Sequence, residues 1–502
     1  MKNPDYILAI DQGTTGTRAG LVNHEGVLVA SKYQEIPQYF PKPGWVEQDP
    51  LEILESVIST VNLLLDECKI NFQSIVSMGI TNQRETTIVW DKFTGKPIYN
   101  AIVWQCRRTT DYCKKLQAKG LSKTISKITG LTIDPYFSAT KVSWILDNVS
   151  GARELAEKGS LAFGTIDSWL VWNLTQGSKH VIDVSNASRT MLFDINELQW
   201  SKELLDIMNI PLSMLPEVVP SSAKLADIST GFYNISSTPL TGIAGDQQSA
   251  LFGQCCFESG TMKVTYGTGA FLLINTGSEL ISADKGLLST IAWSLDGQIS
   301  YALEGAVFSA GSTIQWLRDQ LKIIQTSSEI EELALSVTDN GGVYFVPAFT
   351  GLGTPYWDPD ARASIQGLTR GSNRGHIARA AIESIAYQCN DVINLMLDQS
   401  NISLKDFKAD GGASSNNTLM QFQSDISNFN IHRSYIAETT LLGAAYLAGI
   451  GSGYWSGIEE LESKWTNGGN FYPSMSNQDR NRLISTWDKS VERSLQWEIS
   501  TE

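Results

Sequence analysis

Ala9-Ile10-Asp11-Gln12-Gly13-Thr14-Thr15 and Val264-Thr265-Tyr266-Gly267-Thr268-Gly269 share one short pattern and lie about half a chain length apart. Each stretch includes or follows a short apolar run that predicts a buried strand. Glycine permits a tight turn and a close approach of backbone N–H groups to a ligand, and threonine adds a hydroxyl donor that suits phosphate oxygens. Either loop alone is better explained as an ordinary hairpin turn. The pair, with an acid in the first loop, favours two loops that hold a polyphosphate from both sides.

The composition is typical of a folded globular protein. The chain has 502 residues, of which 42 % are apolar and 18 % charged, so we expect two or more domains. The net charge of −15 argues against non-specific binding to nucleic acid or to anionic membranes. No apolar run approaches the roughly 18 residues of a membrane span. No signal peptide precedes the first predicted strand, so we expect a cytoplasmic protein.

Several familiar site motifs are absent from the sequence. It contains no G-x-x-x-x-G-K-[ST], no G-x-G-x-x-G between a strand and a helix, and no G-x-S-x-G. A P-loop NTPase and a dinucleotide-binding Rossmann domain are therefore not supported. None of the six cysteines forms a C-x-x-C pair and there are four histidines, which argues against structural zinc and predicts buried reduced thiols.

Strand-like and helix-like stretches alternate, which predicts an α/β fold. The predicted strands and hairpins are 6–10, 17–22, 27–32, 74–80 and 260–275, and the predicted helices are 50–67, 311–321, 374–398 and 477–496. A boundary near residue 250 gives an N-terminal lobe (1–250) and a C-terminal lobe (251–502), each with one glycine-threonine loop. The segment 221–238, rich in Ser, Thr and Gly, predicts an exposed excursion.

Asp11 and Arg18 flank the first loop. A carboxylate at the end of a strand could hold Mg²⁺ beside phosphates, and it could equally cap the turn. Arg18 could reach a phosphate oxygen, with a surface ion pair as the alternative.

Six consecutive polar residues, 81–86, follow the strand that ends at Ile80. Ligands bind at strand ends of α/β sheets. Arg84 offers a rigid five-donor fork and Glu85 offers acceptors, a combination that suits a small polyol. The alternative is a surface salt bridge between the two side chains.

Asp246 follows a second apolar approach, at Ile243-Ala244-Gly245. An ionised Asp next to a substrate hydroxyl can take its proton while that oxygen attacks phosphorus. The alternative is a helix N-cap, and both roles are compatible. Trp104 and Tyr136 could pack on a carbon skeleton or in the core. The glycine turn at 410–417, with Asn416, is a weak candidate for an adenosine or α-phosphate site.

These segments together resemble the FGGY family of carbohydrate kinases, and within it the glycerol branch. The resemblance extends from residue 11 to about 450 and rests on the motifs Asp11-Gln12-Gly13-Thr14-Thr15, Thr81-Asn82-Gln83-Arg84-Glu85-Thr86, Val103-Trp104-Gln105-Cys106-Arg107-Arg108-Thr109, Gly164-Thr165-Ile166-Asp167-Ser168-Trp169-Leu170, Ser185-Asn186-Ala187-Ser188-Arg189-Thr190, Ala244-Gly245-Asp246-Gln247-Gln248, Tyr266-Gly267-Thr268-Gly269, Glu304-Gly305-Ala306-Val307-Phe308, Phe345-Val346-Pro347-Ala348-Phe349 and Asp410-Gly411-Gly412.

The resemblance implies two lobes of the actin/hexokinase/Hsp70 (ribonuclease H-like) type with a cleft between them. It implies transfer of a phosphoryl group from ATP to glycerol, which gives sn-glycerol 3-phosphate, with Mg²⁺ as cofactor. The glycerol site would comprise Arg84, Glu85, Trp104, Tyr136, Asp246, Gln247 and Phe271. The nucleotide site would comprise Thr14, Thr15, Gly16, Arg18, Thr268, Gly311, Gln315, Gly412 and Asn416. Asp11 and Asp246 would lie at the metal, with Asp246 as the base.

The chain departs from the family pattern in places. Gly16 stands where a serine is usual, which removes one hydroxyl and leaves the backbone N–H. Phe232 and Tyr233 stand where some relatives carry a phosphorylated histidine, and 230–237 holds no arginine or lysine for fructose 1,6-bisphosphate. We therefore predict neither form of control.

Two other hypotheses stay open at this stage. The substrate could be another polyol or a ketose, such as erythritol, xylulose or dihydroxyacetone. Less favoured is a nucleotide-dependent binding protein without phosphoryl transfer. The resemblance also suggests a homodimer or homotetramer.

Overall fold

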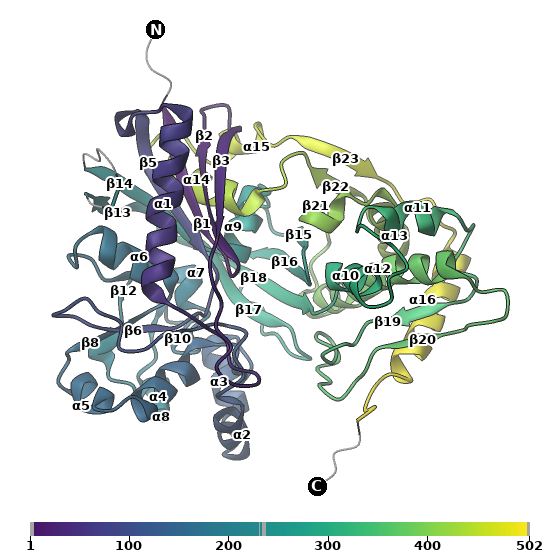
Figure 1. Cartoon of the computed structure of the whole chain (residues 1–502), viewed down its shortest axis with the longest axis horizontal. Helices are drawn as coiled ribbons and strands as arrows, with labels where there is room; N and C mark the ends of the chain where they lie inside the picture. The colour runs from purple at the N-terminus through teal and green to yellow at the C-terminus, as the bar shows by residue number, and fades with distance from the viewer. Residues whose placement is uncertain (1–4, 230, 233–236, 499–502) are drawn as a thin grey trace.

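Among the residues that the structure describes, 13 strands form one continuous sheet through the molecule (Figure 1). The computed structural model describes residues 5–229, 231–232 and 237–498. The strands of this sheet, in spatial order, are β23 (Asn467–Phe471), β22 (Ile431–Ser434), β21 (Asp406–Asp410), β15 (Thr261–Tyr266), β16 (Ala270–Gly277), β18 (Gln298–Val307), β17 (Leu288–Leu295), β13 (Ser222–Ile228), β14 (Thr238–Gly245), β5 (Ile75–Asn82), β1 (Tyr6–Gln12), β2 (Gly16–Val22) and β3 (Leu28–Glu35).

Helices and short two-stranded sheets surround the large sheet. The helices are α1 (Pro50–Cys68), α2 (Thr110–Ala118), α3 (Ser122–Thr129), α4 (Ser138–Asn148), α5 (Ala152–Glu157), α6 (Ile166–Leu174), α7 (Val184–Ala187), α8 (Lys202–Met208), α9 (Asp246–Gly253), α10 (Gly311–Asp319), α11 (Glu329–Leu335), α12 (Arg374–Ser400), α13 (Asn417–Ser427), α14 (Thr439–Gly451), α15 (Ile458–Glu462) and α16 (Asn477–Glu492), with 3₁₀ turns η1 (Phe72–Ser74), η2 (Leu212–Met214) and η3 (Gly412–Ser415). The paired short strands are β4 (Glu47–Gln48) with β7 (Ala101–Ile102), β6 (Ile88–Asp91) with β8 (Leu161–Gly164), β9 (Val181–Asp183) with β12 (Glu217–Val219), β10 (Phe193–Asp194) with β11 (Gln199–Trp200), and β19 (Tyr344–Val346) with β20 (Ser364–Gln366).

The same five-strand arrangement occurs twice in the sheet. In the first half, β3, β2 and β1 are antiparallel neighbours, and β5 and β14 continue the sheet in parallel. In the second half, β18, β16 and β15 are antiparallel neighbours, and β21 and β22 continue in parallel. Each glycine-threonine loop joins the corresponding hairpin, β1 to β2 and β15 to β16. The two loops therefore occupy equivalent places in two related halves.

Strand β1 is buried on both faces. Its alternate side chains pack against two different helices, one on each face of the sheet. Leu8 and Ile10 belong to the core cluster that includes Val57 and Val61 of α1. Ile7 and Ala9 belong to the cluster formed with α14. Successive strand residues point to opposite faces, so α1 and α14 cover opposite sides of the sheet. Although α14 comes late in the chain, it packs on β1, β5 and β14.

Helices α9 and α14 approach each other closely because both carry glycine at the contact. A Cβ on Gly253 would lie 2.0 Å from the Thr439 carbonyl oxygen, and one on Gly443 would lie 1.8 Å from that of Ser249. No larger residue fits at either position without moving a backbone. This contact holds α9, whose first residue is Asp246, against α14.

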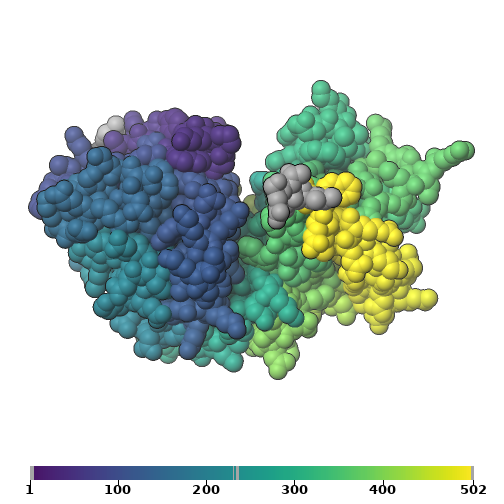
Figure 2. Space-filling view, turned by 90° about the horizontal axis from the view of Figure 1, so that it is seen from below, coloured from purple at the N-terminus to yellow at the C-terminus, as the bar shows by residue number. Residues whose placement is uncertain are grey.

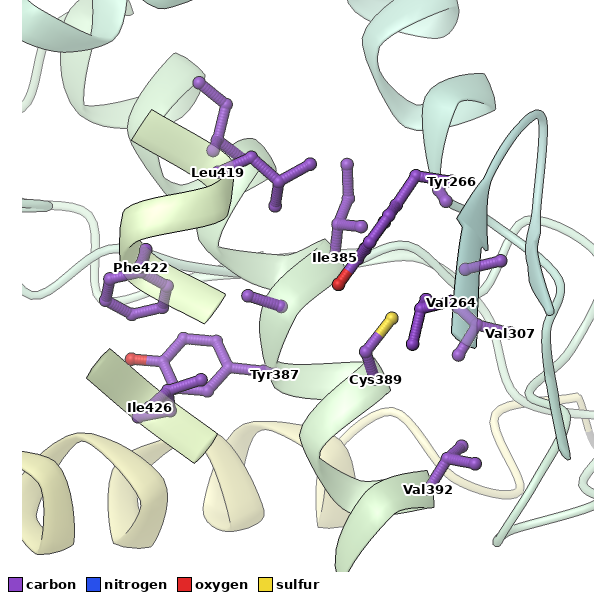
Figure 3. Close-up of a cluster of buried hydrophobic side chains, with 14 of the residues drawn as sticks. Val264, Tyr266, Val307, Ile385, Tyr387, Cys389, Val392, Leu419, Phe422 and Ile426 are labelled. Carbon is purple, nitrogen blue, oxygen red and sulfur yellow. The ribbon is translucent and has the colours of Figure 1, made fainter. Parts of the chain in front are cut away.

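The second half has its own core, in which α12 packs on the sheet and α13 packs on α12 (Figure 3). Val264 of β15 and Val307 of β18 come from the sheet side of this cluster, and Ile385 comes from α12. Tyr387 stacks on Trp487 of α16, with ring centroids 5.0 Å apart and an interplanar angle of 8°. The segments 311–321, 374–398 and 477–496, predicted as helices, are confirmed as α10, α12 and α16.

The prediction of an exposed excursion over 221–238 is wrong for its first part. Residues 222–228 form β13, which pairs with β14 inside the large sheet. Ser222, Leu225 and Ile228 are buried. Phe232 is buried and stacks on Phe72 at 5.7 Å. Residues 230 and 233–236, which bear on the predicted absence of regulation, lie outside the described residues.

No helix among the described residues is both long enough and apolar enough to cross a membrane. All six cysteines are free, and five of them are buried. No group of three or more His, Cys, Asp or Glu side chains that could hold a metal ion occurs in the described ranges.

Candidate active site

A space-filling view shows a notch between the first half of the chain and the second (Figure 2). The polar residues at the ends of β1, β5 and β14 meet residues of β15 and β18 across the middle of the sheet.

The chain turns sharply after β5. The Thr86 N–H donates to the Arg84 carbonyl at 2.7 Å, which makes a three-residue turn, and Glu85 at its centre has a φ of 60°. A positive φ is uncommon for a residue with a side chain, and such strained positions cluster at functional sites. The Ser138 and Thr87 hydroxyls each donate to the Glu85 carbonyl at 3.0 Å and hold the turn in place.

Arg84, Glu85, Arg189 and Glu304 form a buried charge network. Arg84 donates from Nη1 to Glu304 Oε2 at 2.5 Å and from Nη2 to Glu304 Oε1 at 2.9 Å. Arg189 donates from Nε to Glu85 Oε1 at 2.8 Å and from Nη2 to Glu304 Oε1 at 3.0 Å. The four side chains are at most 2 % exposed. The predicted alternative of a surface salt bridge at Arg84 and Glu85 is therefore wrong.

The network holds its carboxylates in different electrostatic conditions. Burial raises the pKa of Glu85, and the two guanidinium groups only partly offset that effect. Burial also opposes ionisation of Glu304, but Arg189 and Arg84 outweigh it and lower the pKa of Glu304 to about 2. Glu304 is thus a firmly ionised anchor for both arginines.

Asp246 is the first residue of α9 and borders this network. Its Oδ1 lies 3.1 Å from Arg84 Nε and accepts a bond from the Gln247 N–H at 2.7 Å. The Asp246 side chain is 31 % exposed, whereas Glu85 and Glu304 are at most 2 % exposed. The N-cap of α9 is Gly245, so the predicted alternative of Asp246 as the N-cap is wrong. The Asp246 carboxylate is thus held by an arginine and remains partly exposed.

Asp11 lies near Asp246. Partial burial, and then the negative charges of Asp246 and Glu438, raise the pKa of Asp11 to about 7, and Arg18 lowers it only in part. Two carboxylates kept together in this way gain stability from a cation between or beside them. Mg²⁺ uses one or two protein carboxylates with waters and phosphate oxygens, so this pair fits that ion.

Trp104 and Tyr136 cover the polar residues with aromatic surface. Their rings contact edge to face with centroids 5.4 Å apart, and both side chains are partly exposed. The Tyr136 hydroxyl accepts from Arg84 Nη2 at 3.3 Å. The Trp104 indole N–H donates to Thr14 Oγ1 at 2.8 Å, which joins this aromatic wall to the first glycine-threonine loop.

The first loop is a tight hairpin held by the Gly13 N–H, which donates to the Gly16 carbonyl at 2.9 Å. Thr15 is exposed at its tip. Arg18 Nε lies 3.2 Å from Glu438 Oε2, so the predicted ion pair is present, and both side chains stay partly exposed. A Cβ on Gly16 would lie 2.5 Å from the Gln34 carbonyl oxygen and from the Tyr33 ring, so the usual serine does not fit in this backbone.

The second loop closes on the start of α10. The Gly267 N–H donates to the Gly269 carbonyl, and the Gly311 N–H donates to the Gly267 carbonyl, both at 2.9 Å. A Cβ on Gly311 would lie 2.6 Å from that Gly267 oxygen, so glycine permits the contact. Thr268 at the tip and Gln315 on α10 are exposed. Thr268, Gly311 and Gln315, all predicted to bind the nucleotide, therefore lie together on the second loop and the start of α10.

The remaining predicted residues lie apart from the charge network. Gly412 is exposed, and a Cβ there would meet nothing within 4 Å. The Asn416 side-chain oxygen accepts from the Leu419 N–H at 2.8 Å and caps α13, which leaves its amide N–H₂ available. Phe271 is half-buried on β16, opposite Thr265 in register, and takes no part in the network.

Three buried charged residues at the candidate site were not assigned a role from the sequence: Arg189, Glu304 and Lys263. Arg189 and Glu304 complete the buried network, and Lys263 donates to the Gln247 side chain. Arg189 and Glu304 lie in segments that carry the family resemblance, and charged residues inside apolar strands were a signal for Lys263 and Glu304.

Comparisons with known proteins agree with this architecture. The chain matches the FGGY family of carbohydrate kinases twice, the N-terminal domain over residues 6–253 and the C-terminal domain over residues 262–452. It is 56 % identical over 492 residues to a glycerol kinase of a Thermoanaerobacter species, which covers 98 % of this chain and 99 % of the relative. It is 54 % identical over 493 residues to glycerol kinase 2 of Thermotoga maritima, with the same coverage.

Solved structures match over nearly the whole chain. Plasmodium falciparum glycerol kinase with ADP superposes with a TM-score of 0.93 at 39 % identity, covering 98 % of both chains. Xylulose kinase from Lactobacillus acidophilus superposes with a TM-score of 0.86 at 23 % identity, which shows a shared fold. The predicted two-lobed actin/hexokinase-like α/β fold is confirmed. By these matches over both halves, the chain belongs to the FGGY family of carbohydrate kinases.

Proposed function

We propose that this chain transfers the γ-phosphoryl group of ATP to a terminal hydroxyl of glycerol and releases ADP and sn-glycerol 3-phosphate. One observation carries the proposal: the partly exposed Asp246 carboxylate is held 3.1 Å from Arg84, beside a buried network of matched charges. Full-length relatives at 54–56 % identity that are named glycerol kinase support the choice of substrate.

Glycerol would lie against the polar side formed by Arg84, Glu85 and Asp246. Its hydroxyls both donate and accept, and this set offers guanidinium donors and carboxylate acceptors. Trp104, Tyr136 and Phe271 would pack on its carbons, and Gln247 would bond a further hydroxyl. An analogue without one hydroxyl would leave a buried polar group unpaired, which is the basis of strong discrimination.

Asp246 would act as the general base. The attacking hydroxyl oxygen forms a bond to the γ-phosphorus, the bond from that phosphorus to the bridging oxygen of ADP breaks, and the hydroxyl proton passes to Asp246. Arg84 keeps the carboxylate oriented toward the substrate. Such a base contributes about 10²–10⁴-fold to the rate.

The two glycine-threonine loops would hold the nucleotide phosphates. Thr14, Thr15, Arg18 and the Gly16 N–H would contact them from the first half, and Thr268, Gly311 and Gln315 from the second. Gly412 and Asn416 would contact the nucleoside side of ATP. Asp11 and Asp246 would hold Mg²⁺, which supplies neutralisation of phosphate charge when bound.

We also propose the finer organisation. The lobes would divide near residue 250, with glycerol residues mainly in 1–250 and nucleotide residues mainly in 251–502. The repeated five-strand arrangement supports this division. A cytoplasmic homodimer or homotetramer is proposed from the family resemblance, and light scattering on the purified chain tests the assembly.

The deciding experiment measures ADP release from Mg·ATP with glycerol, xylulose, erythritol or no acceptor. Release that depends on glycerol supports the proposal. Release with another acceptor keeps the phosphoryl transfer but assigns a different substrate. Binding of ATP without release from any acceptor would favour a nucleotide-dependent binding protein.

A further inference from the structure

Lys263 is a wholly buried ammonium group in β15, near the proposed substrate residues. Its side chain donates from Nζ to Gln247 Oε1 and, at 2.9 Å, to Thr265 Oγ1. Both partners are neutral. An ammonium group buried with neutral partners is expensive to keep, because it loses hydration without the full compensation of an ion pair.

The cost is visible in the acid–base behaviour of Lys263. Burial lowers its pKa to about 8, although Asp410, Asp246 and Glu304 act in the opposite direction. A methionine would fill similar space without this cost. The position of the charge therefore calls for an explanation beyond packing.

The contact with Gln247 supplies that explanation. An amide side chain has one accepting oxygen and one donating N–H₂ group. Because the Lys263 ammonium can only donate, it engages the Gln247 oxygen and leaves the N–H₂ group pointing away from Nζ. Gln247 follows Asp246 at the start of α9 and is half-buried. Its free hydrogen-bonding group is thus fixed as a donor beside the proposed base.

We infer that Lys263 is a positioning residue for substrate selection: it orients the Gln247 amide so that its N–H₂ group binds an accepting hydroxyl oxygen of the alcohol. The inference rests on the proposed function. It adds to that function the residue that makes Gln247 the hydrogen-bond donor to the substrate. It makes one hydroxyl of the substrate an acceptor toward Gln247.

Lys408 on the neighbouring strand provides a matched comparison. It pairs in register with Lys263 and is almost as buried, but its ammonium donates to the backbone carbonyls of Gln254 and Cys255. Removing the Lys408 charge therefore damages the same part of the sheet without touching Gln247. Lys408→Met is the control for a general structural effect.

The test compares kcat/KM for glycerol with kcat/KM for propane-1,2-diol and propane-1,3-diol. Each of the two diols lacks one hydroxyl of glycerol. Gln247→Ala first identifies the diol whose rejection depends on Gln247. Lys263→Met should then lower the preference for glycerol over that diol by about tenfold, the effect of one good hydrogen bond. The preference over the other diol should stay unchanged. The double variant Gln247→Ala, Lys263→Met should lose no further preference, because both changes remove one interaction.

A second variant covers the case in which Lys263→Met does not fold. Gln247→Glu keeps a partner for Lys263 but removes the N–H₂ donor, so it should lower the same preference in a folded protein. The inference is overturned if Gln247→Glu retains the wild-type preference. It is also overturned if Lys263→Met folds and lowers kcat/KM equally for all three alcohols, or matches Lys408→Met. Wild-type protein that phosphorylates none of the alcohols would instead overturn the proposed function.

Discussion

Arg84 and Glu304 lie 220 positions apart in the chain, and two hydrogen bonds of 2.5 Å and 2.9 Å join their side chains. Arg84 follows β5 in the first half of the sheet, and Glu304 lies within β18 in the second. Arg189 also donates to Glu304, so one carboxylate holds two guanidinium groups. This contact joins the turn after β5, in the first half, to a strand of the second half.

Glu304→Gln should therefore destabilise the protein strongly. Two buried arginines would lose their shared anion, and breaking such a buried pair costs about 3–5 kcal/mol. Urea unfolding measures this loss. The control is Glu258→Gln, because Glu258 pairs with Lys405 on the surface at 3.0 Å, and exposed pairs contribute about 0–1 kcal/mol. Equal losses in the two variants would contradict the anchoring role of Glu304.

Asp246→Asn should lower kcat by about 10²–10⁴-fold, because the amide cannot take the proton of the attacking hydroxyl. Arg84 remains held by Glu304, so the site should keep its shape. Steady-state ADP release measures kcat, and the KM for ATP checks that the nucleotide still binds. Asp227→Asn, at an exposed ion pair on β13, is the control with unchanged turnover expected. Near-normal turnover of Asp246→Asn would remove the residue from this role.

Asp11 should release a proton when Mg²⁺ binds in mildly acidic solution. Its pKa is about 7 in the folded protein against 3.8 ordinarily, so at pH 6 the carboxyl group is mostly protonated and must ionise to hold the cation. At pH 8 it is mostly ionised, so the proton release should be much smaller. Calorimetric titration of Mg²⁺ in buffers of different ionisation enthalpy counts the protons.

The raised pKa of Asp11 also predicts how the stability of the protein without a cation changes with pH. Because the folded pKa of Asp11 is raised, its contribution to stability is full below pH 4 and is lost as the pH rises through about 7. Asp11→Asn should flatten this decline and abolish the proton release at pH 6. An unchanged proton count in Asp11→Asn would assign the titration to another group.

Local sequence signals predicted part of the fold: strands β1, β2, β3 and β5, the hairpin β15–β16, and helices α1, α10, α12 and α16. Helix α1 was predicted over 50–67, and in the structure it ends one residue later. The prediction succeeded because Pro50 at the start, the Asp49 cap and the regular apolar spacing all indicate the same helix. Strand β13 was missed because its sequence is rich in small and polar residues and lacks a long apolar run. Its place is set by pairing with β14, which is a property of the sheet and not of the segment.

The sequence predicted those candidate site residues that have a local signal, and it missed contacts between distant segments. Asp11, Arg84 and Asp246 follow apolar strands, and polar residues at strand ends are a local signal. The ion pair between Glu304 and Arg84 has no local signal, because the sequence around each residue does not indicate its distant partner. The role of Lys263 likewise depends on the orientation of one amide group.

Trp104→Phe should weaken glycerol and nucleotide binding together. The indole N–H donates to Thr14 Oγ1 at 2.8 Å, so Trp104 links the aromatic wall to the first loop. Loss of this bond should raise the KM for ATP by about 2–10-fold, the usual effect of one hydrogen bond. Thr14→Val in the Trp104→Phe background should add less than it does alone. Fully additive effects in this cycle would show that the two side chains act independently.

Gly16→Ala should destabilise the first loop and raise the KM for ATP. The new Cβ would lie 2.5 Å from the Gln34 carbonyl oxygen and from the Tyr33 ring, and overpacking of this kind costs about 1–3 kcal/mol. Unfolding in urea measures the cost, with Gly371→Ala as the control, where the nearest atom is 3.7 Å away. Adding Tyr33→Ala should restore part of the stability, since it removes the ring, and the Gln34 carbonyl still prevents full recovery. Wild-type stability of Gly16→Ala would show that β3 can move away from the loop, and the missing serine would then need another explanation.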